Sequence, residues 1–217
     1  MVDPLKDALA QHLKVYGPPS DPRVLVITIE QLVVHRAGFS SRPNDAMTTL
    51  TLRTFLEQNT ARETHFGSLL AATLRHPLAS LPGERYANSN AGYLALGAMV
   101  EEATNETYES ACLARVLAPL GVQNARLDPS WRVLSSGGWS LSGADYLRFF
   151  EIFAPNHPML RRDFRAWMAD KRRKAMSARG AHWYALGVRI DPASGVAFRF
   201  HTPAHGHGRS PSPKMVP

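Results

Sequence analysis

"LPGERYANSNAGYLALGAMVEEAT", residues 81–104, is the stretch from which the fold is best inferred. Its first half is rich in Pro, Gly, Asn and Ser, which are typical of loops. Its second half places small and apolar side chains at helical spacing: Tyr93, Leu96, Gly97, Val100 and Ala103. The stretch therefore predicts a loop that leads directly into an amphipathic helix. Catalytic side chains are often held on such loops, so this one is a candidate functional site.

A second helix is predicted upstream, in "ITIEQLVVHRAGF". Thr28 and, three residues later, Gln31 fit a capping box, so we expect a helix from near Ile29 to about His35. Gly38 would then stop it. We interpret His35 as a packed, hydrogen-bonded residue at the helix end; a catalytic role is the alternative.

Apolar spacing, caps and breakers predict further helices in five stretches: 47–60, 66–78, 108–121, 142–153 and 157–174. Near the end, residues 182–201 alternate in character, contain many β-branched and aromatic residues, and surround the turn sequence "DPASG". This pattern predicts a β-hairpin. The predicted fold class is therefore α+β, mostly helical with one C-terminal hairpin.

Beyond the hairpin, residues 203–217 are rich in proline and nearly devoid of apolar side chains, and we expect a disordered tail. One domain over 1–202 would precede it. His201, His205 and His207 suggest a metal site, but no carboxylate accompanies them and a Pro/Gly-rich segment does not fix ligand geometry. We therefore expect neither a metal nor a cofactor.

The formal net charge of +7 raises nucleic-acid binding as a possibility, and basic residues gather in 161–174. That stretch also fits a helix with a solvated face, which is the reading we prefer. No apolar run approaches the roughly 18–20 residues that span a bilayer. The first residues carry charges where a signal peptide would be apolar, so a cytoplasmic chain without membrane contact is expected.

Cys112 is the single cysteine, which excludes an intramolecular disulfide and a cysteine-based zinc site. It lies one helical turn before Val116 in a stretch with helical spacing. We expect a small buried core residue in preference to a nucleophile.

Five segments, in a fixed order, carry a family resemblance: "ITIEQLVVHRAGF", the opening stretch, "YESACLARVLAPLGVQNARL", "SSGGWSLSGADYLRFF" and "FRFHT". They resemble the β-lactamase and penicillin-binding-protein superfamily of serine hydrolases, in its class C β-lactamase and related esterase branch. The first resembles that branch's T-I-x-x-L-L-x-H-x-S-G segment, from which Arg36 and Ala37 depart. The resemblance runs from about residue 24 to 202.

The resemblance implies a site made of three motifs. A Ser-x-x-Lys motif supplies the nucleophile and a neighbouring amine. Tyr86-Ala87-Asn88 matches the second motif, which makes Tyr86 the proton shuttle and Asn88 the hydrogen-bonding partner of the substrate. His201 matches the first place of a His-x-Gly third motif and would support the tyrosine hydroxyl and the substrate.

Two of the three motifs are incomplete. None of the five lysines has a serine three residues before it, so Ser-x-x-Lys is absent. Pro203 stands where the third motif has glycine, and proline has no N–H for an oxyanion hole. We expect a helical subdomain with a hairpin from an incomplete antiparallel sheet, truncated at both ends relative to the family.

The resemblance implies acyl-enzyme hydrolysis of a small ester or amide: a carboxylic ester, a β-lactam or a D-amino-acid peptide. His201 in place of a lysine favours the esterase side. Because the nucleophile motif is absent, the chain as given is expected to be inactive. The alternative is a non-catalytic binding or interaction protein, or a decayed product, derived from that family. The sequence does not indicate an oligomeric state.

Overall fold

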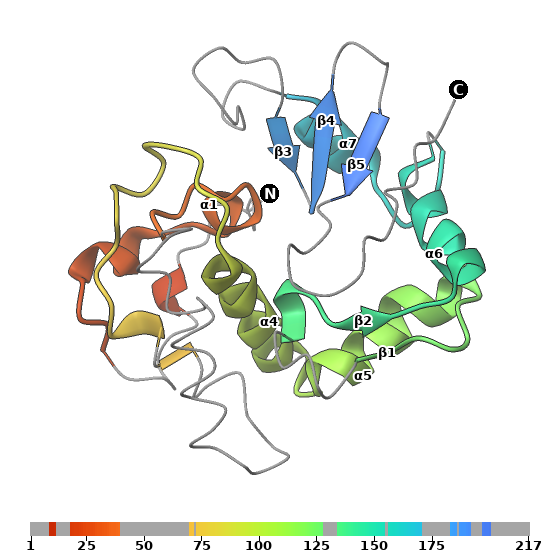
Figure 1. The fold of residues 1–217 in the computed structure, drawn as a ribbon, viewed down its shortest axis with the longest axis horizontal. Coiled ribbons are helices and arrows are strands. Elements are labelled where there is room, and N and C mark those ends of the chain that lie inside the picture. The colour runs from red at the N-terminus through yellow and green to blue at the C-terminus, as the bar shows by residue number, and fades with distance from the viewer. Residues whose placement is uncertain are drawn as a thin grey trace, which may run out of the picture.

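The computed structural model describes residues 9–11, 18–39, 70–71, 73–127, 134–154, 156–170, 183–185, 187–191 and 197–200. These residues form a helical part and a small antiparallel sheet (Figure 1). The predicted α+β class is therefore confirmed. In the described part of the chain, no helix is both long and apolar enough to cross a membrane.

The N-terminal part consists of short elements that wrap a common core. Two 3-10 turns, η2 (Leu9–Gln11) and η4 (Pro22–Val26), precede helix α1 (Ile29–Val33). The Asp21 carboxylate caps η4, pairs with Arg23 at 2.6 Å and accepts the Leu78 N–H at 2.9 Å. This buried carboxylate therefore ties the start of the domain to the segment that leads into the 81–89 loop.

Helix α1 begins where the sequence predicts it. The Thr28 side chain accepts the Gln31 N–H, and the Gln31 side chain accepts the Thr28 N–H, so the predicted capping box is present. The helix ends at Val33, two residues earlier than expected. It ends there because His35 adopts a left-handed backbone with φ of 56°, which cannot continue a right-handed helix.

Helix α4 (Asn90–Thr104) is the longest described helix and lies against α1 (Figure 1). Ser89 caps its start, and Asn105, with φ of 53°, ends it. The predicted apolar face was too narrow, because buried positions lie around most of the helix: Ala91, Gly92, Leu94, Ala95, Gly97, Ala98 and Met99. Ala103, assigned to that face, is exposed. Elements pack on several sides of α4, so a single stripe does not describe it.

The chain from Tyr108 to Leu120 is helical throughout but changes type. It runs from α5 (Tyr108–Cys112) through a π turn, η5 (Leu113–Leu117), to the 3-10 turn η6 (Ala118–Leu120). Gly121, with φ of 71°, ends it as predicted.

Two more helices follow. Helix α6 (Gly143–Phe150) starts with the predicted Ser142 cap and continues into the 3-10 turn η8 (Glu151–Phe153). Helix α7 (Arg162–Ala169) is shorter than the predicted 157–174, of which residues 171–174 lie outside the described part. The Trp167 indole N–H donates to Glu30 at 3.0 Å, which attaches α7 to α1.

The C-terminal sheet has three antiparallel strands in the order β3-β4-β5 (Figure 1). They are β3 (Trp183–Ala185), β4 (Val188–Asp191) and β5 (Ala197–Phe200). The predicted hairpin corresponds to β4 and β5, whereas its first arm divides into two strands. Ala185 pairs with Val188, so only two residues form the turn, and Gly187 takes φ of 76° there.

A second, two-stranded pair was not predicted. Strand β1 (Arg126–Leu127) pairs with β2 (Trp139–Ser140), just after the 3-10 turn η7 (Leu134–Ser136). Two-residue strands carry too little alternation to be detected in a sequence.

Buried side chains form two clusters. The larger one joins η2, η4 and α1 to α4 and includes Leu9, Val24, Ile27, Leu32, Leu70, Leu74 and Leu94, each at most 2% exposed. The smaller one lies around η5 and β2 and includes Leu117, Val122 and Ala125, with Trp139 and Phe149 packed against it.

Several expectations lie outside the described residues. They are the helix at 47–60, residues 66–69 and 72 of the helix at 66–78, His201, Pro203, His205 and His207, and the tail 203–217. Leu70–Ala71 and Thr73–Leu74, within 66–78, are helical. The domain boundary after residue 202 therefore stays a prediction.

Candidate active site

Tyr86 and Asn88 lie on the loop that runs beside the turn after α1. Ala87, between them, donates its N–H to the His35 carbonyl at 2.9 Å. The neighbouring Gly83 N–H donates to the Arg36 carbonyl at 2.7 Å. Backbone bonds therefore hold the two segments together and leave both motif side chains half-buried.

Arg36, which departs from the family pattern, reinforces the same loop. Its guanidinium donates to the Gly83 carbonyl at 2.9 Å and to the Glu84 carbonyl at 2.9 Å. The substitution therefore adds a side-chain anchor for the loop that precedes Tyr86.

His35 occupies the centre of the site and is only 6% exposed. Its Nδ1 accepts the Ser89 N–H at 3.3 Å, and its Nε2 lies 3.3 Å from the carboxamide nitrogen of Asn88. The prediction of a packed, hydrogen-bonded residue is confirmed. No local pattern predicts the left-handed backbone of His35, which has φ of 56°.

Three tyrosine rings surround this imidazole. The ring centroids of Tyr86, Tyr93 and Tyr184 lie 5.8, 4.9 and 4.6 Å from that of His35. The Tyr86 ring meets His35 edge-on, at an interplanar angle of 89°. Tyr93 comes from α4 and Tyr184 from β3, so the cluster joins the helical part to the C-terminal sheet.

Tyr93 and Tyr184 act as hydrogen-bond donors within the fold. Burial raises the pKa of Tyr93 to about 12 and raises the pKa of Tyr184 above its usual range. The Tyr93 hydroxyl donates to the Val33 carbonyl at 3.0 Å and also hydrogen-bonds the Tyr184 side chain. Both phenols therefore stay protonated at neutral pH and are unsuited to act as bases.

Sequence reasoning missed Tyr93 and Tyr184 as parts of the site. Tyr93 was assigned to a helix face, and Tyr184 to a hairpin, because each position is explained by local spacing alone. Their convergence on His35 depends on tertiary packing, which a single sequence does not reveal. His201, the third predicted site residue, lies outside the described residues.

Other chemistry-bearing groups lie elsewhere. Cys112 is half-buried, not fully buried as expected, and burial raises the pKa of its thiol, which disfavours the reactive thiolate. Within the described ranges, no three His, Cys, Asp or Glu side chains gather as a metal site would require.

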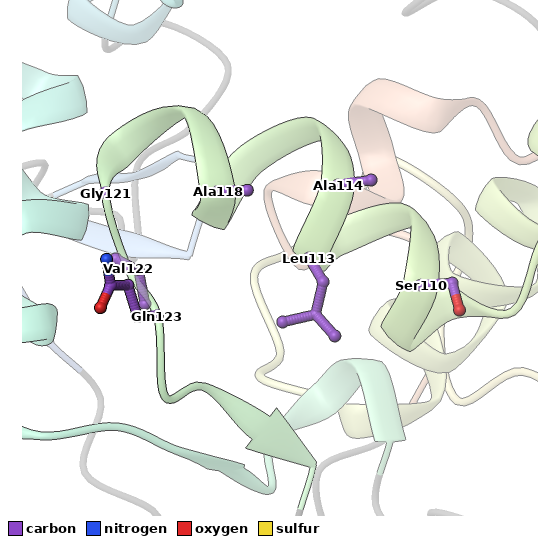
Figure 2. A pocket seen from close by; sticks show the side chains of 7 residues that line it. All are labelled: Ser110, Leu113, Ala114, Ala118, Gly121, Val122 and Gln123. Carbon is purple, nitrogen blue, oxygen red and sulfur yellow. The ribbon is translucent and has the colours of Figure 1, made fainter.

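A shallow, open depression of about 700 Å³ lies on the surface of the α5–η6 run (Figure 2). Its lining is mostly apolar and comprises Ser110, Leu113, Ala114, Ala118, Gly121, Val122 and Gln123. None of these residues belongs to the cluster around His35, so the depression and the motif loop are separate features.

Solved structures with the same fold include hydrolases. A penicillin-binding protein from Bacillus halodurans superposes with a TM-score of 0.70 at 17% identity, over 88% of this chain and 64% of that one. A D-stereospecific amidohydrolase from Streptomyces sp. has a TM-score of 0.70 at 18% identity, over 91% and 66%. EstCE1, a hydrolase with promiscuous acyltransferase activity, has a TM-score of 0.68 at 17% identity, over 86% and 62%. The chain thus spans about two thirds of the length of these proteins.

A curated sequence relative is described as a fimbrial assembly protein, FimD of serogroup D, from Dichelobacter nodosus. It is 33% identical over 93 residues, which are 42% of this chain and 21% of that protein. The family model described as Beta-lactamase matches residues 4–210, nearly the whole chain. Because this match covers nearly the whole chain, the chain belongs to the β-lactamase family.

Proposed function

We propose that this chain carries the proton-relay and substrate-binding side of a β-lactamase-type acyl-transfer site, without its nucleophile. Tyr86 is the proton shuttle and Asn88 the hydrogen-bonding partner of the substrate. The observation that carries the proposal is the placement of both side chains on one loop held to His35, in a chain with no Ser-x-x-Lys.

Acyl transfer by this family needs a serine hydroxyl activated by a neighbouring amine. Removing the nucleophile from a serine hydrolase lowers kcat by about 10⁶. Tyr86 and Asn88 can relay a proton and bind an acyl group, but neither replaces that covalent step. The 217-residue chain is therefore a partial site that does not turn over esters or amides.

The family and the structures that share the fold support a proposal for the substrate class. A D-stereospecific amidohydrolase and a hydrolase with promiscuous acyltransferase activity share the fold, which supports an amide or another acyl compound as the substrate. We propose a small ester or amide as the substrate of the complete site, with His201 favouring an ester. The nucleophile would lie in a segment outside these 217 residues.

Hydrolysis assays with matched variants test the proposal. The chain, its Tyr86→Phe variant and its Asn88→Ala variant are compared with p-nitrophenyl acetate, nitrocefin and a D-amino-acid p-nitroanilide. We expect three identical rates at the level of a denatured sample. A rate at least tenfold higher in the unsubstituted chain, abolished by Tyr86→Phe, would show a working site and overturn the proposed inactivity.

A non-catalytic binding function is the second candidate. The loop that carries Tyr86 and Asn88 is hydrogen-bonded to His35, although the chain has no Ser-x-x-Lys motif. Saturable binding of N-acetyl-D-alanine amide, lost in Asn88→Ala and without product formation, would favour it. Absence of binding at millimolar ligand would leave the partial hydrolase site as the better account.

A further inference from the structure

The hydrogen-bond partners of the two ring nitrogens of His35 determine which nitrogen carries the proton. Nδ1 lies 3.3 Å from the Ser89 backbone nitrogen, which carries a hydrogen and can only donate. Nδ1 must therefore present a lone pair. A neutral imidazole carries one proton, so that proton is on Nε2.

The opposite tautomer conflicts with this geometry. A proton on Nδ1 would point at the Ser89 N–H, so two donors would face each other at 3.3 Å. The Ser89 backbone cannot turn away, because Ser89 is the N-cap of α4 and its side chain accepts the Ala91 N–H. The helix start thus selects the Nε2–H tautomer.

This tautomer sets the orientation of Asn88. An Nε2–H group can donate but cannot accept, so the group 3.3 Å from it must be an acceptor. The two ends of a carboxamide have nearly the same shape and are assigned from their hydrogen bonds. The carboxamide is therefore assigned the other way round, with Oδ1 in the position of the nitrogen that lies 3.3 Å from His35 Nε2, and with both hydrogens of Nδ2 directed away from the ring.

We propose that His35 is a positioning residue that holds the Asn88 carboxamide with Oδ1 toward the imidazole and Nδ2 free to donate to an acyl oxygen of a ligand. The ligand-binding part of this inference rests on the proposed function, whereas the tautomer and the amide orientation do not. The Ala87 N–H donates to the His35 carbonyl at 2.9 Å, and this backbone bond holds the imidazole of His35 beside the carboxamide of Asn88.

The tautomer is measurable in the unsubstituted chain. Long-range ¹H–¹⁵N correlation spectra at about pH 8, above the ordinary imidazole pKa of about 6.5, distinguish a protonated ring nitrogen from an unprotonated one. We expect Nε2 to be the protonated nitrogen of His35 and Nδ1 the unprotonated one. Protonation on Nδ1, or on both nitrogens, would overturn the proposal without any variant having to fold.

Two substitutions separate the roles of the ring nitrogens. His35→Gln retains a polar group near the Nε2 position, and His35→Asn retains an acceptor near Nδ1 and tolerates the left-handed backbone. We expect the Asn88 side-chain amide resonances to stay near their original shifts in His35→Gln. In His35→Asn they should move toward averaged, exposed-amide shifts, while the Ser89 N–H resonance is retained.

The outcomes are distinct from those of the hydrolysis assays. A purely structural role predicts that the two variants lose similar stability while the Asn88 amide keeps its shifts in both, and that result would refute positioning. If the unsubstituted chain hydrolyses an ester but shows the Nε2–H tautomer, the proposed inactivity fails and the positioning role stands. If the unsubstituted chain is inactive but His35 carries its proton on Nδ1, the positioning role fails and the proposed inactivity stands.

Discussion

The rings of His35 and Tyr184 lie with their centroids 4.6 Å apart, and Tyr184 is 6% exposed. His35 follows α1, whereas Tyr184 lies on β3, so this contact connects the helical part to the C-terminal sheet. The Tyr184 side chain also hydrogen-bonds Tyr93 of α4. The site and the junction between the two parts are therefore the same cluster.

Tyr184→Ala should lower the free energy of unfolding by about 3–4 kcal/mol, as expected when a buried aromatic ring is deleted. Tyr184→Phe keeps the ring and should cost about 1 kcal/mol for the lost hydrogen bond. Urea unfolding followed by circular dichroism measures both. Equal costs for the two variants would show that the ring contact with His35 contributes nothing.

Gly38→Ala should lower the free energy of unfolding by about 2–4 kcal/mol. Gly38 has φ of 90°, and an added Cβ would lie 2.5 Å from the Ser80 carbonyl oxygen, so either the turn or the loop before Tyr86 must shift. Gly143→Ala in α6 is the matched control, because apart from its chain neighbours and the backbone of its own helix nothing lies within 4 Å of the added Cβ. Its stability should be unchanged or up to about 1 kcal/mol higher. Similar losses in both variants would contradict the role of the turn.

We expect the ionised Asp21 carboxylate to make the free energy of unfolding fall in acid. Its hydrogen bonds with Arg23 hold the pKa of this carboxyl well below its usual range. Because the folded pKa is the lower one, the contribution is fully present above the unfolded pKa of about 3.9 and is lost as the pH falls through the folded value.

Asp21→Asn should therefore cost about 1–2 kcal/mol at pH 7, a modest value because Arg23 is 39% exposed. The difference from the unsubstituted chain should narrow below about pH 4. Asp163→Asn, in the exposed pair with Arg161, is the control and should leave stability unchanged. A constant difference between pH 7 and pH 3 would exclude the ionised carboxylate as the cause.

We expect the buried Tyr93 phenol to make the free energy of unfolding fall in alkali. Burial raises its pKa to about 12, above the unfolded value of about 10. The folded state then holds the proton more tightly, so the contribution is present below about pH 10 and is lost as the pH rises toward 12. At pH 8, Tyr93→Phe should have a free energy of unfolding about 1 kcal/mol lower than that of the unsubstituted chain. Between pH 10 and pH 12, its free energy of unfolding should fall by less than that of the unsubstituted chain. Thermal unfolding across this range tests it; equally steep losses in both proteins would rule it out.

The sequence predicted those features that depend on local chemistry. Thr28 and Gln31 gave the start of α1, and Ser142 the start of α6, because capping is decided within one turn. Tyr86 and Asn88 were found as a motif within a single loop. The alternation near the end predicted β4 and β5.

Features that depend on packing were missed. The left-handed backbone of His35 ends α1 early, although histidine carries no stop signal in a sequence. Gly187 divides one predicted strand into two, because a two-residue turn is hidden by the alternation around it. The approach of Tyr184 to His35 joins positions far apart in the chain, which no local pattern encodes.

The central claim is that Tyr86 and Asn88 belong to a β-lactamase-type site with no acylatable serine in this chain. Intact-mass spectrometry after incubation with a fluorophosphonate, and separately with benzylpenicillin, tests it most directly. The account predicts an unchanged mass with both reagents, in the unsubstituted chain and in Tyr86→Phe alike. A stoichiometric adduct on one serine of the folded chain, absent from Tyr86→Phe, would contradict it.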